Sequence, residues 1–335
     1  MRRLLVITCL IVAPVLAAAQ ADEVTLWITL GDSDQLVEVD AYSFREIRRI
    51  TVDPKPHGLS ASADGTRLYV ASDRTGNFQV VDARTGTITA QVNLGKDPNQ
   101  MTITDDGLFA YVPMRDEDAI AVVQLDPLRI IRKIPSPAGP HDSYAAPDSR
   151  LIYVGAQRGN AIAVVDPESR SIVRSIATAD GVRPMEPSND GKRLYASLSN
   201  LVGFIVVDPA TRQVLRRVEL GGLPDGVPAP YLDTWTHSLE LVKNDSELWV
   251  TDCINDLVRI VDTKDYKEIG QIRVGHFPHW FSARGDGKVL FLSLWYSDAV
   301  AAIDIDTRKV LTNIQFARGS GPKRILVTPR VRAAS

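Results

Sequence analysis

Apolar and polar residues alternate in short runs along most of this chain, and the runs repeat at a fixed interval. Each copy holds four β-rich runs separated by turn residues, a pattern typical of short antiparallel strands. The Asp64-Gly65 pair and its equivalents supply the positive φ angles of a tight hairpin between the first two runs. Seven copies of this size predict an all-β fold, a seven-bladed β-propeller with four-stranded blades. One aromatic residue marks the same point of every copy, with steps of 42 residues and one step of 54: Trp27, Tyr69, Tyr111, Tyr153, Tyr195, Trp249 and Phe291.

The two ends of the chain together supply one copy. The first copy lacks residues for its innermost strand, because the segment before Trp27 is mostly an apolar leader. Residues 321–327 repeat the opening pattern of a copy, with no copy after them. We therefore expect one C-terminal innermost strand to join three N-terminal strands and close the ring, which removes exposed sheet edges. The prediction is one propeller domain over residues 22–330 and a tail over residues 331–335.

The first 21 residues have the composition of a secretory signal peptide. Two arginines precede an apolar run from Leu4 to Leu16, and small residues follow it. Cleavage near Ala19 or Ala21 would release a periplasmic or secreted protein. No second apolar stretch approaches the roughly 20 residues that a bilayer crossing needs, so we expect no membrane span.

Composition narrows the choice of partners. Without the leader the chain has 36 basic and 41 acidic residues, a formal charge of −5. This balance gives no reason to expect nucleic acid or an anionic membrane as a partner. Cys253 is the only cysteine outside the leader, so the domain has no intrachain disulfide. The pattern carries no indication of oligomeric state.

The aromatic positions lie in recognisable blocks. Leu68-Tyr69-Val70-Ala71-Ser72 and Ile152-Tyr153-Val154-Gly155, each followed by a Val-Val-Asp segment, resemble the YVTN repeat family of secreted propellers. The resemblance covers nearly all of the chain after the leader and implies the propeller fold. The family includes periplasmic and surface-layer proteins and is distantly similar to haem d1 propellers, so the resemblance implies no single activity.

A carboxylate recurs thirteen residues after most of the marking aromatics. A residue present in nearly every blade is more typical of a turn than of a catalytic centre. We interpret these carboxylates as caps of the turn after the third strand. They are Asp40, Asp82, Asp166, Asp208, Asp262 and Asp304, with Gln124 in the remaining copy.

A second repeat position holds four of the five histidines. It lies twelve residues before the aromatic, where the chain enters the innermost strand. We therefore expect its side chains to surround one mouth of the central channel. The seven members, here called the mouth ring, are His57, Asn99, His141, Arg183, His237, His279 and Lys323.

The mouth ring is compatible with a transition metal. Neutral imidazole binds Cu, Fe, Zn or Mn. Calcium requires oxygen ligands, and the mouth ring contains no carboxylate. With His57, His141, His237 and His279 as ligands, the chain would be a metal-dependent oxidoreductase or lyase. That is one alternative for the function.

The same ring also suits a small anionic ligand. Arg183 and Lys323 supply positive charge, and Asn99 supplies an amide. A carboxylate, a phosphate or a tetrapyrrole propionate would meet these groups, although the histidines favour a metal over a tetrapyrrole. No Cys-x-x-Cys-His segment is present, so covalent c-type haem is excluded. A third alternative is a scaffold for a periplasmic protein partner, and the sequence leaves all three open.

Two acids follow the mouth ring by three residues. Glu186 and Glu240 are candidate catalytic residues, because a carboxylate there could act as a general base or orient a histidine. Pairing with nearby cations or channel water is an equally simple role for them.

The single step of 54 residues contains an insertion immediately before His237. The insertion should therefore overhang the mouth ring. Together with Trp280, Trp295 and Tyr296 from the next blade, its side chains would form an aromatic wall next to polar groups, the usual form of a small-molecule site. The candidate ligand-binding residues of this wall are Tyr231, Asp233, Trp235, Trp280 and Tyr296.

Overall fold

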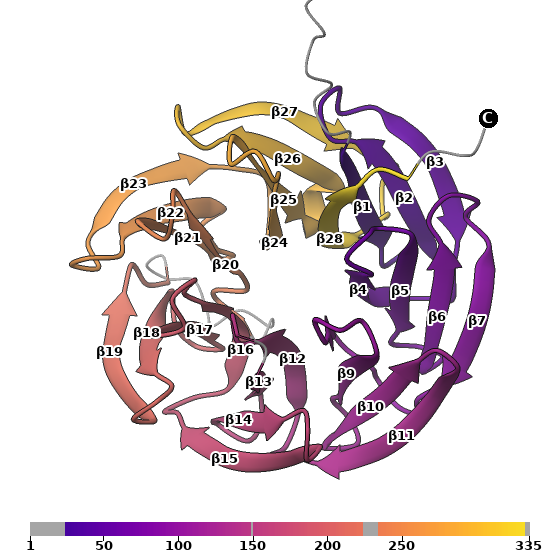
Figure 1. Cartoon of the computed structure of the whole chain (residues 1–335). Helices are drawn as coiled ribbons and strands as arrows, with labels where there is room; N and C mark the ends of the chain where they lie inside the picture. Colours follow the sequence, from indigo (N-terminus) through magenta and orange to yellow (C-terminus); the bar gives the residue numbers. More distant parts are fainter. Residues whose placement is uncertain (1–23, 149, 224–233, 332–335) are drawn as a thin grey trace, which may run out of the picture.

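Seven four-stranded antiparallel sheets surround one axis in the computed structural model, which describes residues 24–148, 150–223 and 234–331 (Figure 1). The predicted all-β, seven-bladed propeller is confirmed. The leader predicted over the first 21 residues lies outside the described residues. The only helix among the described residues is the short 3-10 turn η1 (Trp295–Ser297), and no helix there is long and apolar enough to cross a membrane.

Each blade runs outward from an innermost strand beside the axis. Blade 1 consists of β28 (Pro322–Pro329), β1 (Val24–Leu30), β2 (Gln35–Asp40) and β3 (Glu46–Thr51). Blade 2 holds β4 (Pro56–Ala61), β5 (Arg67–Ser72), β6 (Asn77–Asp82) and β7 (Ile88–Asn93), and blade 3 holds β8 (Thr102–Ile103), β9 (Phe109–Met114), β10 (Ala119–Leu125) and β11 (Leu128–Pro135). Blade 4 holds β12 (Pro140–Ala145), β13 (Ile152–Ala156), β14 (Ala161–Asp166) and β15 (Ser171–Ala177). Blade 5 holds β16 (Val182–Pro187), β17 (Leu194–Leu198), β18 (Gly203–Asp208) and β19 (Gln213–Glu219). Blade 6 holds β20 (Leu239–Val242), β21 (Glu247–Asp252), β22 (Leu257–Asp262) and β23 (Glu268–Arg273), and blade 7 holds β24 (Pro278–Ala283), β25 (Val289–Leu294), β26 (Ala299–Asp304) and β27 (Lys309–Gln315).

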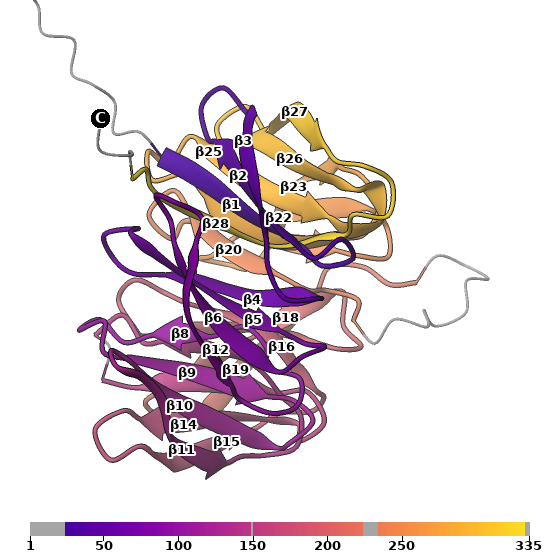
Figure 2. The same ribbon diagram turned by 90° about the vertical axis from the view of Figure 1, so that its right-hand side faces the viewer.

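The ring closes as the sequence predicts. The C-terminal strand β28 pairs antiparallel with β1, and Trp27 lies opposite Leu326. The Trp27 indole N–H donates a hydrogen bond of 3.2 Å to the Thr328 hydroxyl. Figure 2 shows β1 and β28 side by side although they come from opposite ends of the chain.

The apolar core lies between neighbouring blades rather than in one centre. Trp27 and Leu36 of blade 1, for example, pack against Leu59 and Val70 of blade 2 in one buried cluster. The aromatic residues that mark the repeat are all buried. They therefore serve as the packing units that join each sheet to its neighbour.

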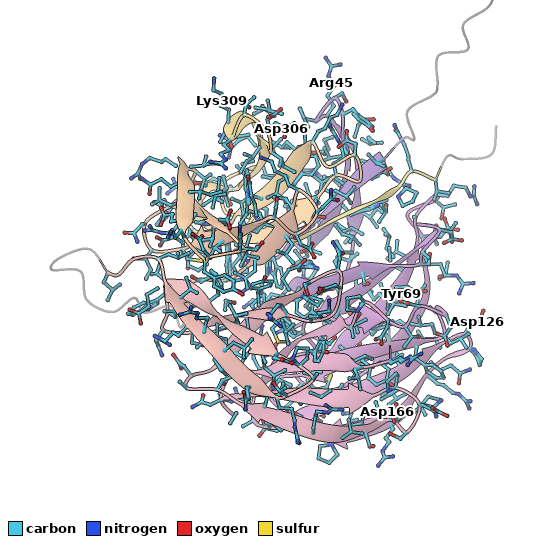
Figure 3. The ribbon with its side chains drawn as sticks, turned by 60° about the vertical axis from the view of Figure 1, so that its left-hand side comes forward. Arg45, Tyr69, Asp126, Asp166, Asp306 and Lys309 are labelled. Carbon is cyan, nitrogen blue, oxygen red and sulfur yellow. The ribbon has the colours of Figure 1, made fainter. Side chains whose placement is uncertain are left out.

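The turns confirm the interpretation of the repeated carboxylates. Asp82 Oδ1 accepts hydrogen bonds from the backbone N–H groups of Arg84 and Thr85 at 2.9 and 2.8 Å. The equivalent Asp166 lies at the periphery of the molecule, far from any mouth of the channel (Figure 3). The Asp-Gly hairpins are confirmed only in part: Gly65 has a φ of +69°, which glycine adopts without strain, whereas Asp64 is not among the residues with positive φ.

Candidate functional site

The mouth ring residues occupy irregular positions at the start of the innermost strands. In β4 the pairing with β5 passes from Pro56 to Gly58 and leaves out His57. In β12 and β24 the pairing likewise skips His141 and His279. A residue outside the ladder is not bound by the strict alternation of a strand. Strict alternation would direct these side chains toward the face that packs against the next blade. The irregular pairing allows them to point elsewhere.

A left-handed residue precedes the mouth ring by two positions in several blades. Positive φ redirects the chain from the loop into the innermost strand, and glycine adopts it most easily. Two blades do use glycine, but three keep a side chain at this position. The φ angles are 56° at Lys55, 56° at Asp97, 65° at Gly139, 58° at Phe277 and 58° at Gly321.

The four ring histidines lie against one another. Ring centroids are 6.2 Å apart for His57 and His141, 5.7 Å for His141 and His237, and 3.6 Å for the stacked rings of His237 and His279. Each is no more than 3% exposed. Because His57, His141 and His237 come from blades 2, 4 and 6, their contacts require the side chains to converge toward the axis.

Two of the histidines are held by carboxylates. His57 Nδ1 lies 3.0 Å from Asp73 Oδ1, and His141 Nδ1 lies 2.6 Å from Asp142 Oδ2. Burial lowers the pKa of His57 to about 4, and the Asp73 charge offsets only part of that effect. Burial also lowers the pKa of His141. Both imidazoles are therefore neutral near pH 7, and Nδ1 carries the proton that faces the carboxylate.

The other two histidines stay neutral as well. Burial holds the pKa of His237 and of His279 well below the usual value. For His237 the next cause is the neighbouring His279, and for His279 it is the charge of Lys323. The site thus holds four neutral imidazoles next to two permanent cations.

The remaining ring members supply donors. Arg183 Nε donates a hydrogen bond of 3.0 Å to the Ser199 hydroxyl, and Arg183 is 3% exposed. Lys323 Nζ lies 3.4 Å from Asp73 Oδ2. Asn99 is fully buried, and its Oδ1 accepts the backbone N–H of Gln100. Asp73 therefore links two members of the mouth ring, His57 and Lys323.

Several buried polar atoms at the mouth have no hydrogen-bond partner among the described residues. Two are obligate donors, Asn99 Nδ2 and Trp280 Nε1. Three are imidazole nitrogens, His57 Nε2, His237 Nδ1 and His279 Nδ1. Leaving such a group unsatisfied costs about 1–3 kcal/mol, and folded proteins rarely do so without a reason.

An aromatic wall flanks the histidines on the side of blade 7. The Trp295 ring lies 5.0 Å from His279 and stacks on Tyr296 at 5.7 Å. Phe277 lies 5.6 Å from His279, and Trp280 meets His237 edge to face at 5.0 Å. The predicted wall residues Trp280, Trp295 and Tyr296 are therefore brought to the site, together with Phe277, which the sequence analysis did not place in the wall.

Only part of the insertion lies within the described residues. Tyr231 and Asp233 lie outside the described residues. Trp235 is fixed through its backbone, which bonds to Ser199 and Cys253. Among the residues that the structure describes, its ring makes no aromatic contact with the wall.

The two candidate acids lie further along the inner strands. Burial, followed by the charge of Glu240, raises the pKa of Glu186 well above its usual value. Burial raises the pKa of Glu240 to about 7, against the effects of Arg324 and the Ala283 amide. Within the described ranges, no hydrogen bond joins either acid to a ring histidine. The structure therefore places them near each other in the channel but does not bring them to the imidazoles.

The partners of the ring share a repeat position that the sequence analysis did not single out, although it placed one member, Trp295, in the aromatic wall. Asp73, Ser199 and Trp295 each follow their ring residue by sixteen positions, at the end of the second strand of the same blade. The antiparallel hairpin returns that residue to the same mouth. Comparing all copies at this offset would have found these residues, although their chemical types differ from blade to blade.

Metal-ligand geometry is not preformed. Among the described residues, no group of three or more His, Cys, Asp or Glu side chains is arranged to hold a metal ion. Cys253 is buried, its thiol points to the Pro278 carbonyl at 3.1 Å, and burial raises the thiol pKa. Metal binding by the four histidines remains a prediction.

Comparison with solved structures identifies the architecture. A hydrazine synthase structure from Kuenenia stuttgartiensis matches with a TM-score of 0.76 and 18% identity over 84% of this chain and 92% of that chain. The dihydro-heme d1 dehydrogenase NirN, solved in complex with DHE, matches with a TM-score of 0.67 and 15% identity over 88% of this chain and 64% of that one. A functionally unknown protein from Desulfotomaculum acetoxidans matches with a TM-score of 0.74 and 11% identity, over 91% and 98% of the two chains.

These structures are seven-bladed propellers, and at such identities the likeness establishes the fold alone. No protein-family model and no curated protein sequence matches the chain.

Proposed function

We propose that this protein binds a small ligand with an oxyanion group, a carboxylate or a phosphate, at the mouth ring. The observation that carries the proposal is the set of buried donors without a partner, above all Asn99 Nδ2 and Trp280 Nε1. Arg183 and Lys323 add positive charge at the same mouth. A ligand rich in acceptor atoms would satisfy these donors, and charge-assisted bonds of this kind are strong.

The wall of Phe277, Trp295 and Tyr296 favours a ligand with a flat face. Lys323 Nζ lies 5.2 Å from the centroid of the Trp295 ring, so the cation and the aromatic surface are adjacent. A planar ligand could stack on the wall while its anionic group reaches the cation. NirN, solved in complex with DHE, is a propeller of similar architecture with a bound molecule.

Benzoate is a suitable probe, because it combines one flat ring with one carboxylate. We expect calorimetric titration to show one binding site, with weaker binding of acetate, which lacks the ring. Asn99→Asp keeps the oxygen that accepts the Gln100 N–H and replaces the free donor with a negative charge. We expect this variant to bind benzoate at least about tenfold more weakly, because one lost charge-assisted bond costs more than 1.4 kcal/mol.

Circular dichroism and thermal melting would confirm that Asn99→Asp is folded. Lys264→Met removes an exposed charge from an outer turn and serves as the control. Equal benzoate affinity in the wild type and in folded Asn99→Asp, or absence of any binding to the wild type, would contradict the proposal.

A transition metal is the second candidate, because two carboxylate–imidazole pairs are already formed. In His57–Asp73 and His141–Asp142 the carboxylate holds Nδ1 and leaves Nε2 as the basic nitrogen. This is the arrangement that orients histidines toward metals. The stacked rings of His237 and His279 would have to separate to join them. A metal held in this way could support oxidation or elimination chemistry.

Elemental analysis of protein purified from its native compartment tests the metal directly, and an absorption spectrum tests for a tetrapyrrole. Stoichiometric Cu, Fe, Zn or Mn that is lost in a His141→Ala, His237→Ala double variant would support the metal. Asn99→Asp separates the two candidates, because an added carboxylate weakens anion binding but not metal binding. If the purified protein is free of metal and also fails to take up Cu²⁺ or Zn²⁺, the transition-metal candidate is excluded.

We also propose that the site works outside the cytoplasm. The first 21 residues have the pattern of a secretory leader. Recovery of leader-free protein from the periplasm or the medium, with an N-terminus at residue 20 or 22, is the expected outcome of N-terminal sequencing.

A further inference from the structure

A cleft of about 480 Å³ opens between the mouth-side loops of blades 2 and 3. Four basic residues line it, Lys55, Arg74, Lys96 and Arg115. The loops that carry them lead into β4 and β8 or join the second and third strands of the same blades. The cleft is therefore beside the mouth ring, and Asp73 contributes both to its lining and to the pair with His57.

Each acid of the cleft pairs with a basic residue other than Lys55, Arg74 and Lys96. Asp73 contacts His57 and Lys323, as described above. Asp97 Oδ2 accepts a hydrogen bond of 2.7 Å from Arg115 Nε, and the exposed Asp116 lies 3.2 Å from Arg158. Arg115 is thus already neutralised by a carboxylate inside the cleft.

The other three cations have no such partner. Within the described part of the chain, no carboxylate lies in ion-pair contact with Lys55, Arg74 or Lys96. Their charges line one cleft, so their attractions for a bound anion add together. Three cations without a direct ion pair at one cleft match a compact oxyanion with two or more negative charges better than a single carboxylate, although Lys96 also acts on the Glu117 carboxylate from a distance.

The backbone around the cleft is fixed before any ligand arrives. Lys55 holds a left-handed φ of 56°, as Asp97 and Phe277 do at the equivalent positions of blades 3 and 7, where blades 4 and 1 use Gly139 and Gly321. That conformation costs a non-glycine residue about 1–2 kcal/mol. The Lys96 backbone N–H donates to Glu117 Oε1 at 2.7 Å, which anchors the loop and leaves the ammonium group in the cleft.

We propose that this cleft is a second anion site, which holds a multiply charged oxyanion of the phosphate type through Lys55, Arg74 and Lys96. The site is distinct from the mouth ring, and its occupancy does not depend on the ligand proposed there. Because the cations are exposed, binding weakens steeply as salt is added.

Inorganic pyrophosphate is the probe, titrated calorimetrically into the full chain at an ionic strength of about 10 mM, where screening is weak. We expect one site that a Lys55→Gly, Lys96→Met double variant weakens at least tenfold. Lys55→Gly also relieves the left-handed strain, so the single variant should melt no lower than the wild type. This separates loss of binding from loss of folding.

The control variant is Lys264→Met, Lys309→Met, which removes the same charge from two exposed lysines, one in an outer turn and one at the start of the outer strand β27; Figure 3 labels Lys309. Pyrophosphate binding should be unchanged in this control. The cleft variants should retain benzoate binding, so failure of this site and failure of the mouth ring are distinguishable. Absence of pyrophosphate binding to the wild type, or equal weakening in the control and the cleft variant, would overturn the proposal.

Discussion

Gly58 limits how closely two blades can approach at the mouth. A Cβ atom on Gly58 would lie 2.5 Å from the Asn99 carbonyl oxygen of the next blade and 2.8 Å from Met101 Cε. The backbones of β4 and of the segment before β8 can be this close only because residue 58 has no side chain. The close approach of Gly58 to the Asn99 carbonyl at this inner edge therefore depends on a single glycine.

We predict that Gly58→Ala lowers the free energy of unfolding by about 2 kcal/mol or more, because overpacking against a backbone atom forces the blades apart. Urea titration measures the change. Gly285→Ala is the matched control, since no atom lies within 4 Å of a Cβ built there. A Gly58→Ala protein as stable as the Gly285→Ala protein would show that the blades separate without cost.

Single residues also show where the sequence stops being informative. The mouth ring could be found because four copies of one residue type recur at one repeat position. Its partners Asp73 and Ser199 share a position but no chemistry, so a search by residue type does not find them and only a comparison of all copies at that offset does. The stack of His237 on His279 depends on rotamers, which spacing does not determine.

At the scale of strands, side chains three residues beyond the ring connect adjacent inner strands. The Ser282 hydroxyl of β24 accepts the Val327 N–H of β28 at 3.1 Å. Glu240 of β20 accepts the Ala283 amide, and Glu186 of β16 accepts the Leu241 amide. The sequence predicted these two acids as candidate catalytic residues. Their contacts indicate that each acid bridges two neighbouring inner strands, a role that the spacing of the repeat did not predict.

We predict that Glu240 makes the fold less stable as the pH rises. Its pKa is raised to about 7 in the folded protein, against 4.5 for the free side chain. Between these values the folded state binds more protons than the unfolded state, so stability falls as the pH rises from about 4.5 through 7. The loss from a shift of this size is at most about 3 kcal/mol.

Urea unfolding at pH 5 and pH 8 measures this effect. In Glu240→Gln the part of the pH dependence that comes from this carboxyl should disappear, while Glu219→Gln, on the exposed β19, should behave as the wild type. Parallel pH dependence in wild type and Glu240→Gln would show that Glu240 ionises as readily in the fold as outside it.

At the scale of the whole molecule, the regular spacing predicted blade number, strand number and closure, because every blade repeats the same alternation and packs on two similar neighbours. The irregular step was less informative. The prediction that the insertion before His237 overhangs the mouth ring stays a prediction, because Tyr231 and Asp233 lie outside the described ranges. A repeat predicts what its copies share, whereas a loop without a counterpart has no copy to compare.

Closure of the ring rests on one strand, and its removal should destabilise all seven blades. β28 provides Ile325, which is fully buried, and the partner for the whole length of β1. A chain that ends at Gly319 would leave β1 as an open edge and expose Trp27, so we expect its melting temperature to fall by more than about 10 °C. A chain that ends at residue 331 is the control and should melt as the full-length protein does. A synthetic peptide of residues 320–331 should restore part of the lost stability, because it can pair with β1 in the native register. Unchanged melting of the shorter chain would mean that the six remaining blades and three strands of blade 1 hold the ring without β28.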